Sequence, residues 1–281
     1  MRFDNLLYEL KDPRTLAKIK LPKVINETDS LYKTISSGKS VARYGDGEFK
    51  LILGENISFQ KYDAKLAECL KSILKNNNDK LLVGIIDIFG CPPSDYMRKV
   101  AINCREEIYK YLNFNKEYLD SMYTRKVKFV SPEQGVDYFS KMKQLWENKD
   151  IVIVEGAGSR LGVGNDLFSN TKSIKRILCP IKDAFSKYDE IRKECLKQEK
   201  DKLFILALGP TATVLAEDLA NEGYIALDIG HLDTAYEAFL RGSEKFVHIE
   251  GKIVFNEERR NNMIKPCKDE NYNKEIIANL N

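Results

Sequence analysis

Two acidic residues set between glycines form the first group that could do chemistry, in the segment Arg43-Tyr44-Gly45-Asp46-Gly47-Glu48. Asp46 and Glu48 lie two positions apart, so in an extended segment both carboxylates project to one side. Carboxylate oxygens are hard ligands that suit Mn²⁺ or Mg²⁺, which share the rest of their shell with phosphates and water. Gly45 lets the backbone approach a ligand closely, and Arg43 can offset phosphate charge. The alternative is a solvated turn, because Gly-Asp-Gly is a common turn composition.

A glycine-rich segment, residues 156–166, directly follows an apolar run. Its four glycines, beginning at Gly156, leave backbone N–H groups free to face an anion, and side-chain donors come from Ser159, Arg160 and Asn165. The segment is not a Walker loop, because no Gly-Lys-Ser/Thr sequence follows, and its glycine spacing differs from that of a dinucleotide fingerprint. We expect a nucleotide or phosphate site here. The alternative is a flexible loop over the sheet.

The third group is Gly209-Pro210-Thr211-Ala212-Thr213, where an apolar run ends and a helical pattern begins. Thr211 or Thr213 can cap the helix, and the free N–H groups of its first turn attract a phosphate. Gly209 and Pro210 form the turn itself. The alternative is plain capping without a ligand, because threonine is a common cap.

The fourth group follows the apolar run that ends at Leu227, and it contains His231, Asp233 and Glu237. Asp233 and Glu237 are four positions apart and would share one face of a helix. These residues can act as a general base, position a sugar hydroxyl or complete a metal shell. His231 lies between two acids that can orient its ring and shift its pKa. The alternative for a single histidine is a structural hydrogen bond.

Apolar runs precede all four groups and predict the strands that position them. The runs are continuous rather than alternating, and helical patterns separate them, which favours a mainly parallel, Rossmann-like α/β sheet with helices on both faces. Such sheets bind ligands beyond the carboxyl ends of their strands, so the four groups should collect along one edge. The expected strands include residues 81–88, 127–130, 151–154, 176–179, 203–208 and 224–227, and the expected helices include residues 66–74, 97–108, 139–146 and 211–220.

Composition excludes several other classes of protein. The 281 residues are 43% hydrophobic and 31% charged, which is too apolar for a disordered chain. The net charge of +3 argues against a nucleic-acid binder that relies on bulk positive charge. The longest uncharged apolar stretch, residues 203–216, is too short to span a bilayer, and no signal peptide is recognisable, so we expect a cytoplasmic protein without a transmembrane segment. Six scattered cysteines and two histidines argue against a zinc site.

Taken together, these segments resemble a bacterial glycosyltransferase family, first described as the domain of unknown function DUF1792 and now called the GT-D fold. The resemblance runs from about residue 35 to residue 257. It rests on RYGDGE (43–48), ISFQKYD (57–63), VEGAGSRLGVGNDLF (154–168), RILCPIKDAFSKYDEI (176–191) and LGPTATVLAEDLANEGYIALDIGHLDTAYE (208–237).

The resemblance implies a single GT-D domain over residues 35–257 that transfers a sugar from a UDP-sugar, typically UDP-glucose with Mn²⁺. Asp46-Gly47-Glu48 fits the family's Asp-x-Glu metal motif. The implied acceptor is a glycan or glycoprotein in surface glycan assembly, so other glycan-assembly enzymes are expected partners. Residues 1–34 are then expected to form a helical lead-in, and the polar, asparagine-rich residues 258–281 a surface tail.

Two alternatives use the same residues. A metal-dependent hydrolase of nucleotides or sugar phosphates would employ the same acids and glycine segments. A sugar-nucleotide-binding module without catalytic activity would keep the phosphate-binding groups and scaffold a glycan-assembly complex.

Overall fold

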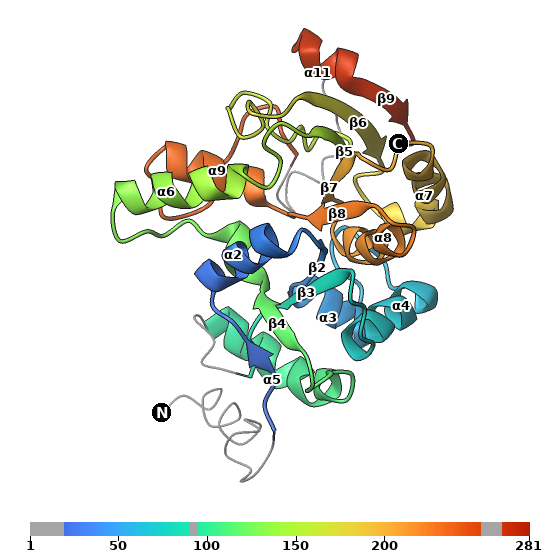
Figure 1. Cartoon of the computed structure of the whole chain (residues 1–281). Coiled ribbons are helices and arrows are strands. Elements are labelled where there is room, and N and C mark those ends of the chain that lie inside the picture. Colours follow the sequence, from blue (N-terminus) through green and yellow to red (C-terminus); the bar gives the residue numbers. More distant parts are fainter. Residues whose placement is uncertain (1–19, 90–94, 254–265) are drawn as a thin grey trace.

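A computed structural model describes residues 20–89, 95–253 and 266–281, whose strands form one sheet (Figure 1). The strand order is β1-β4-β3-β2-β8-β7-β5-β6-β9, and every pair of neighbours is parallel. The predicted α/β class with a mainly parallel sheet is therefore confirmed. The strands are β1 (Lys23–Val24), β2 (Ser40–Tyr44), β3 (Leu81–Ile85), β4 (Glu117–Asp120), β5 (Asp150–Gly156), β6 (Ser173–Cys179), β7 (Leu203–Ala207), β8 (Ile225–Asp228) and β9 (Ile276–Asn279).

Helices cover both faces of the sheet, as the continuous apolar runs predict. In β5, Val152 and Val154 pack into one core, and Ile151 and Ile153 pack into the other. The first core is closed by α4 (Ala64–Lys75), α5 (Asp95–Tyr109), α7 (Tyr188–Leu196) and α8 (Pro210–Asn221), and the second by α2 (Glu27–Ser37), α6 (Pro132–Lys143) and α9 (Leu232–Leu240). A strand that buries both faces cannot alternate polar and apolar residues, which explains its pattern.

Between residues 110 and 130, the sequence predicts a strand in the wrong place and misses the one that the structure has. Residues 127–130 form no strand, and Val130 is 94% exposed. The strand in this region is β4, which has only Tyr118 and Leu119 buried between two acids. Asp120 then accepts a hydrogen bond from the N–H of Met122 and begins the 3-10 helix η1 (Ser121–Arg125). Two apolar residues are too few to show the repeating pattern by which a strand is recognised in a sequence.

The ends of the chain also differ from the prediction. Residues 258–281 are not a surface tail where the structure describes them, because α11 (Glu270–Glu275) leads into β9, which pairs with β6. Tyr272 is buried there. Within residues 1–34, described from residue 20 onward, β1 extends the opposite edge of the sheet before α2 begins.

The centre of the sheet brings distant sequence segments together. Strands β2 and β8 are neighbours, with Val41 opposite Leu227, so the residues that follow them share one edge. The short helix α3 (Asp46–Ile52) follows β2, and α9 follows β8. In the described part of the chain, no helix is long and apolar enough to cross a membrane.

Candidate active site

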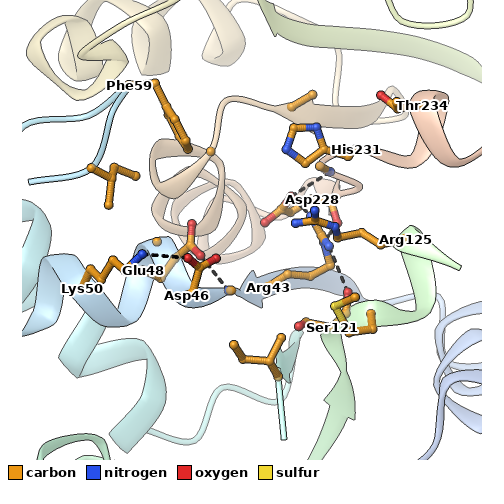
Figure 2. A pocket seen from close by; sticks show the side chains of 18 of the residues that line it. Arg43, Asp46, Glu48, Lys50, Phe59, Ser121, Arg125, Asp228, His231 and Thr234 are labelled. Carbon is orange, nitrogen blue, oxygen red and sulfur yellow. Dashed lines mark hydrogen bonds and ion pairs between the residues drawn. The ribbon is translucent and has the colours of Figure 1, made fainter. Parts of the chain in front are cut away.

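A cavity of about 650 Å³ opens at the carboxyl ends of the central strands (Figure 2). Eight predicted site residues line it: Arg43, Gly45, Asp46, Glu48, Ser159, Gly209, His231 and Asp233. Seven others do not: Gly156, Arg160, Asn165, Pro210, Thr211, Thr213 and Glu237. The expectation that all four sequence groups meet at one edge is therefore confirmed for part of each group.

Arg43 and Asp228 both line this cavity and contact each other. The Nε of Arg43 donates to the backbone oxygen of Asp228 at 2.7 Å, and its Nη2 lies 3.1 Å from Oδ1 of that residue. Its Nη1 donates to the backbone oxygen of Ser121. Burial raises the pKa of Asp228, although the neighbouring Arg43 charge opposes that shift. These three contacts hold the guanidinium of Arg43 in place on the cavity wall.

The predicted metal ligands lie in the first turn of α3 rather than in an extended segment, so the expectation that an extended backbone aligns them is wrong. Both still line the cavity. Glu48 accepts a hydrogen bond from the N–H of Gly45 at 2.6 Å, and burial raises its pKa to about 7. Burial alone would raise the pKa of Asp46, but hydrogen bonds from Tyr96 and Lys50 outweigh it and lower that pKa.

These two carboxylates fit a divalent cation that takes only part of its shell from protein. Among the described residues, no group of three or more histidine, cysteine or acidic side chains could enclose a metal ion. The hydrogen bonds of the Asp46 carboxylate to described residues both reach Oδ2, from Lys50 and Tyr96. Oxygen donors from two acids, supplemented by phosphate and water, are the usual environment of Mg²⁺ or Mn²⁺ at a nucleotide.

Most N–H groups of the glycine segment that could face an anion already donate hydrogen bonds within the protein. The N–H of Leu161 donates to Glu155 at 2.8 Å, and the N–H of Gly162 donates to Asp233 at 2.9 Å. The amides of Val163 and Asn165 are bonded within the segment. The expectation of a row of free N–H groups facing an anion is therefore wrong for these positions, and Ser159 is the predicted donor that reaches the cavity.

The side chains of Arg160 and Asn165 brace the segment instead of lining the cavity. Arg160 donates to the backbone oxygen of Gly251 at 2.7 Å. Asn165 donates to both Asp233 and Glu237. The predicted shared face of these two acids is thus confirmed, with an amide rather than a ligand between them.

The turn before α8 is more enclosed than predicted. Gly209 is the N-cap, and neither threonine caps the helix. Thr211 is buried, and Thr213 donates to the backbone oxygen of Arg43 at 2.9 Å. Phe59 lies so close to Gly209 that a Cβ there would come within 2.6 Å of its ring. The first turn of α8 therefore supports β2 and leaves Gly209 at the cavity.

The three candidates for a general base have different environments. Asp233 lines the cavity, but Lys252 contacts its Oδ2 at 2.6 Å and two donors occupy its Oδ1. Glu237 lies outside the cavity and pairs with Arg241. His231 lines the cavity at the start of α9.

Sequence reasoning missed several lining residues, among them Lys50, Tyr96, Ser121 and Arg125. Arg125 has no acidic partner among the described residues, and its buried Nε makes no hydrogen bond to them. Burial, followed by the charge of Arg43, lowers the pKa of Arg125. Its position at the end of η1 depends on β4, which the sequence did not reveal. Asp228 was considered only as one of the two acids that flank His231, and the structure places it as the last residue of β8, on the cavity wall.

Acids and arginines line a cavity at the carboxyl edge of a parallel α/β sheet, the edge at which proteins of this class bind their ligands. The family described as "Glycosyltransferase GT-D fold" matches residues 41–257, and the chain belongs to this family.

Two curated relatives are streptococcal glycosyltransferases. One is the probable glycosyl transferase Gly of Streptococcus gordonii, 36% identical over 272 residues, which cover 92% of this chain and 39% of that protein. The other is the glycosyltransferase GlyD of Streptococcus pneumoniae serotype 4, 36% identical over 269 residues, which cover 92% of this chain and 32% of that protein. The chain therefore spans only about a third to two fifths of the length of these relatives.

Solved structures show the same fold. A new glycosyltransferase (DUF1792) from Streptococcus sanguinis superimposes with a TM-score of 0.83 at 36% identity, covering 93% of this chain and all of that one. A structure described as the highly conserved DUF1792 with a distinct glycosyltransferase fold gives a TM-score of 0.82 at 34% identity, covering 99% of this chain and 98% of that one.

Proposed function

We propose that this chain is a metal-dependent glycosyltransferase that moves glucose from UDP-glucose to a hydroxyl group of a glycan or glycoprotein. The observation that carries the proposal is one cavity that joins an acid pair, Asp46 and Glu48, with two arginines, Arg43 and Arg125. A diphosphate needs both kinds of group, because a cation between acids and phosphates neutralises one side of it and arginines can neutralise the other. Family membership supports the reaction class.

Asp46 and Glu48 would hold the divalent cation, Mn²⁺ or Mg²⁺. When bound, such a cation acts as a Lewis acid and stabilises negative charge on the leaving diphosphate. Lys50 adds a positive charge beside Asp46, 3.0 Å from its carboxylate. The cation that the acids hold and the ammonium group of Lys50 would therefore place positive charge where the bond between sugar and diphosphate breaks.

The remaining lining residues divide between donor and acceptor. Arg43, Arg125, Ser159 and Gly209 would contact the nucleotide, by charge or by hydrogen bonds. Figure 2 shows Arg43 and Asp228 between the Asp46–Glu48 pair and His231, so the acceptor is proposed to enter from the side of His231.

A thermal-shift screen tests the donor. A ligand that binds only the folded chain raises its unfolding free energy by mass action, by about 2.7 kcal/mol when the ligand concentration is a hundred times Kd. The melting temperature rises accordingly. UDP-glucose with Mn²⁺ should stabilise the chain more than GDP-, CMP- or dTDP-sugars, and chelation should reduce the shift. No UDP-specific shift would contradict the proposed donor.

Substitution of the acid pair tests the reaction. The double variant Asp46→Asn/Glu48→Gln should release UDP from UDP-glucose about 10³-fold more slowly than wild type at saturating Mn²⁺. Asp137→Asn removes an exposed acid of α6 that pairs with Lys141, and it should behave like wild type. An undiminished rate in the double variant would contradict the metal assignment. Free phosphate as the product would indicate a hydrolase instead.

A further inference from the structure

We propose that Asp228, and neither Asp233 nor Glu237, is the carboxylate that removes the proton of the acceptor hydroxyl. The inference rests on the proposed glycosyltransferase function and identifies a catalytic residue within it. It begins from the position of Asp228 as the last residue of β8, one of the two central strands.

One oxygen of this carboxylate is fixed and the other is available. Oδ1 accepts hydrogen bonds from Nη2 of Arg43 and from the N–H of Gly230, both at 3.1 Å. Oδ2 makes no hydrogen bond to any residue that the structure describes, although the side chain is only 5% exposed. Because Asp228 lines the cavity, that limited exposure faces the space where the substrates would meet. A base needs this arrangement, with one atom held and the other facing the proton.

The other acids of the site are already committed. Both oxygens of Asp233 are occupied, by Lys252 on one and by Gly162 and Asn165 on the other. Glu237 does not reach the cavity. One oxygen of Glu48 accepts a hydrogen bond from the N–H of Gly45. Glu48 also lies two residues from Asp46, with which it is proposed to hold the cation. His231 also lines the cavity and is the rival that the experiment must separate.

The surroundings of Asp228 suit a base. Burial raises the pKa of its carboxyl, while the contact with Arg43 keeps that rise in check. Effective bases have a pKa near the working pH, so a shift upward from the ordinary value of an aspartate is in the useful direction.

The proposed step is a single displacement. The acceptor oxygen forms a bond to C1 of the sugar as the bond from C1 to the diphosphate oxygen breaks, and that electron pair leaves with UDP. The acceptor proton passes to Oδ2 of Asp228, which returns it to water after the products leave. Direct displacement inverts C1, so α-linked UDP-glucose gives a β-product.

Chemical rescue tests the assignment, with water and azide as the acceptors. Asp228→Asn keeps an oxygen for Arg43 and Gly230 but cannot take a proton. With UDP-glucose and Mn²⁺, this variant should release UDP to water at least 10²-fold more slowly than wild type, yet show the wild-type thermal shift with UDP. Sodium azide is anionic and needs no base, so it should restore UDP release at least tenfold and yield β-glucosyl azide. Wild type should gain little from azide.

Parallel variants make each outcome informative. Asp228→Ser, which leaves more room for azide, undergoes the same assay in case the asparagine variant folds poorly. Asp233→Asn should show no rescue, because its role is structural. Rescue of His231→Asn instead, a wild-type rate in Asp228→Asn, or no rescue of either Asp228 variant would overturn the assignment. Wild-type chain that neither binds UDP nor releases it would refute the proposed function instead.

Discussion

Arg43 and Asp228 join the two central strands of the sheet at their carboxyl ends. The guanidinium contacts both the backbone and the carboxylate of Asp228, and it reaches Ser121 beyond β4 with its remaining nitrogen. One side chain of β2 thereby contacts both the end of β8 and Ser121, the residue that directly follows β4.

Replacing Gly230 should displace Arg43. Gly230 has a φ of 49°, and a Cβ there would lie 1.9 Å from Nη2 of Arg43. Gly230→Ala should therefore lose about 3 kcal/mol of unfolding free energy, from left-handed strain and from the lost contact, and UDP release should slow at least tenfold. Urea denaturation and the UDP assay measure the two effects.

Gly242→Ala is the matched control for that substitution. Gly242 has a φ of 63°, and a Cβ there would have nothing within 4 Å. This variant should show only the backbone strain, about 1 kcal/mol. Equal losses in the two alanine variants would mean that the contact with Arg43 is unimportant.

Breaking the buried pair of Lys252 and Asp233 should be costly. The two side chains are 3% and 4% exposed and lie 2.6 Å apart. Lys252→Met leaves a buried carboxylate without its cation, so we expect a loss of about 3–5 kcal/mol in unfolding free energy. The double variant Lys252→Met/Asp233→Asn should recover part of that loss. Lys245→Met, at an exposed position, is the control. A similar loss of unfolding free energy in that variant would show that the ion pair of Lys252 and Asp233 is not the cause.

Removing Glu275 should weaken the link between the end of the chain and the glycine segment. Glu275 contacts Arg176 at 2.6 Å, and Arg176 contacts Glu155, which accepts the N–H of Leu161. Glu275→Ala should lose about 2 kcal/mol of unfolding free energy, because Arg176 is nearly fully buried. Glu270→Ala, which removes an exposed pair with Lys274, should change it by less than about 0.5 kcal/mol. If Glu275→Ala and Glu270→Ala melt at the same temperature, the prediction is wrong.

The protonation of Glu48 should make stability depend on pH. Its pKa is about 7 in the folded chain, against an ordinary value of 4.5. Between these values the folded chain binds more protons than the unfolded chain, so unfolding free energy should fall as pH rises from about 4.5 to about 7. Relative to Glu48→Gln, wild type should lose on the order of 2–3 kcal/mol across this range.

Urea denaturation at several pH values, in the presence of a chelator, measures that difference. Glu68→Gln, at an exposed position on α4, should run parallel to wild type at every pH. A constant difference between wild type and Glu48→Gln would show that Glu48 ionises in the folded chain as it does in the unfolded one.

The strands were predictable where both faces are buried and the apolar run is long. Strands β5, β6, β7 and β8 all coincide with predicted runs, because a central parallel strand has no polar side to interrupt it. Strand β4 was missed because it has two apolar residues between acids. Strand β9 was missed because it forms an edge of the sheet, where alternate residues are exposed.

The site was predictable as a set of strand ends but not as a set of contacts. The residues after β2, β5, β7 and β8 meet because parallel strands end at one edge. The partner of each polar group depends on tertiary packing, so the sequence could not show that Asp233 binds Lys252 while one oxygen of Asp228 faces the cavity. Arg125 was missed along with the strand before it.

The separation of Arg43 and Asp228 along the chain, 185 positions, has a consequence for biosynthesis. During translation β2 emerges before its neighbour β8, and the five strands β3 to β7 emerge between them. Closing so long a loop is slow and unfavourable in entropy. We therefore expect nascent chains to expose an unpaired edge of β2 and to depend on chaperones until β8 inserts beside it.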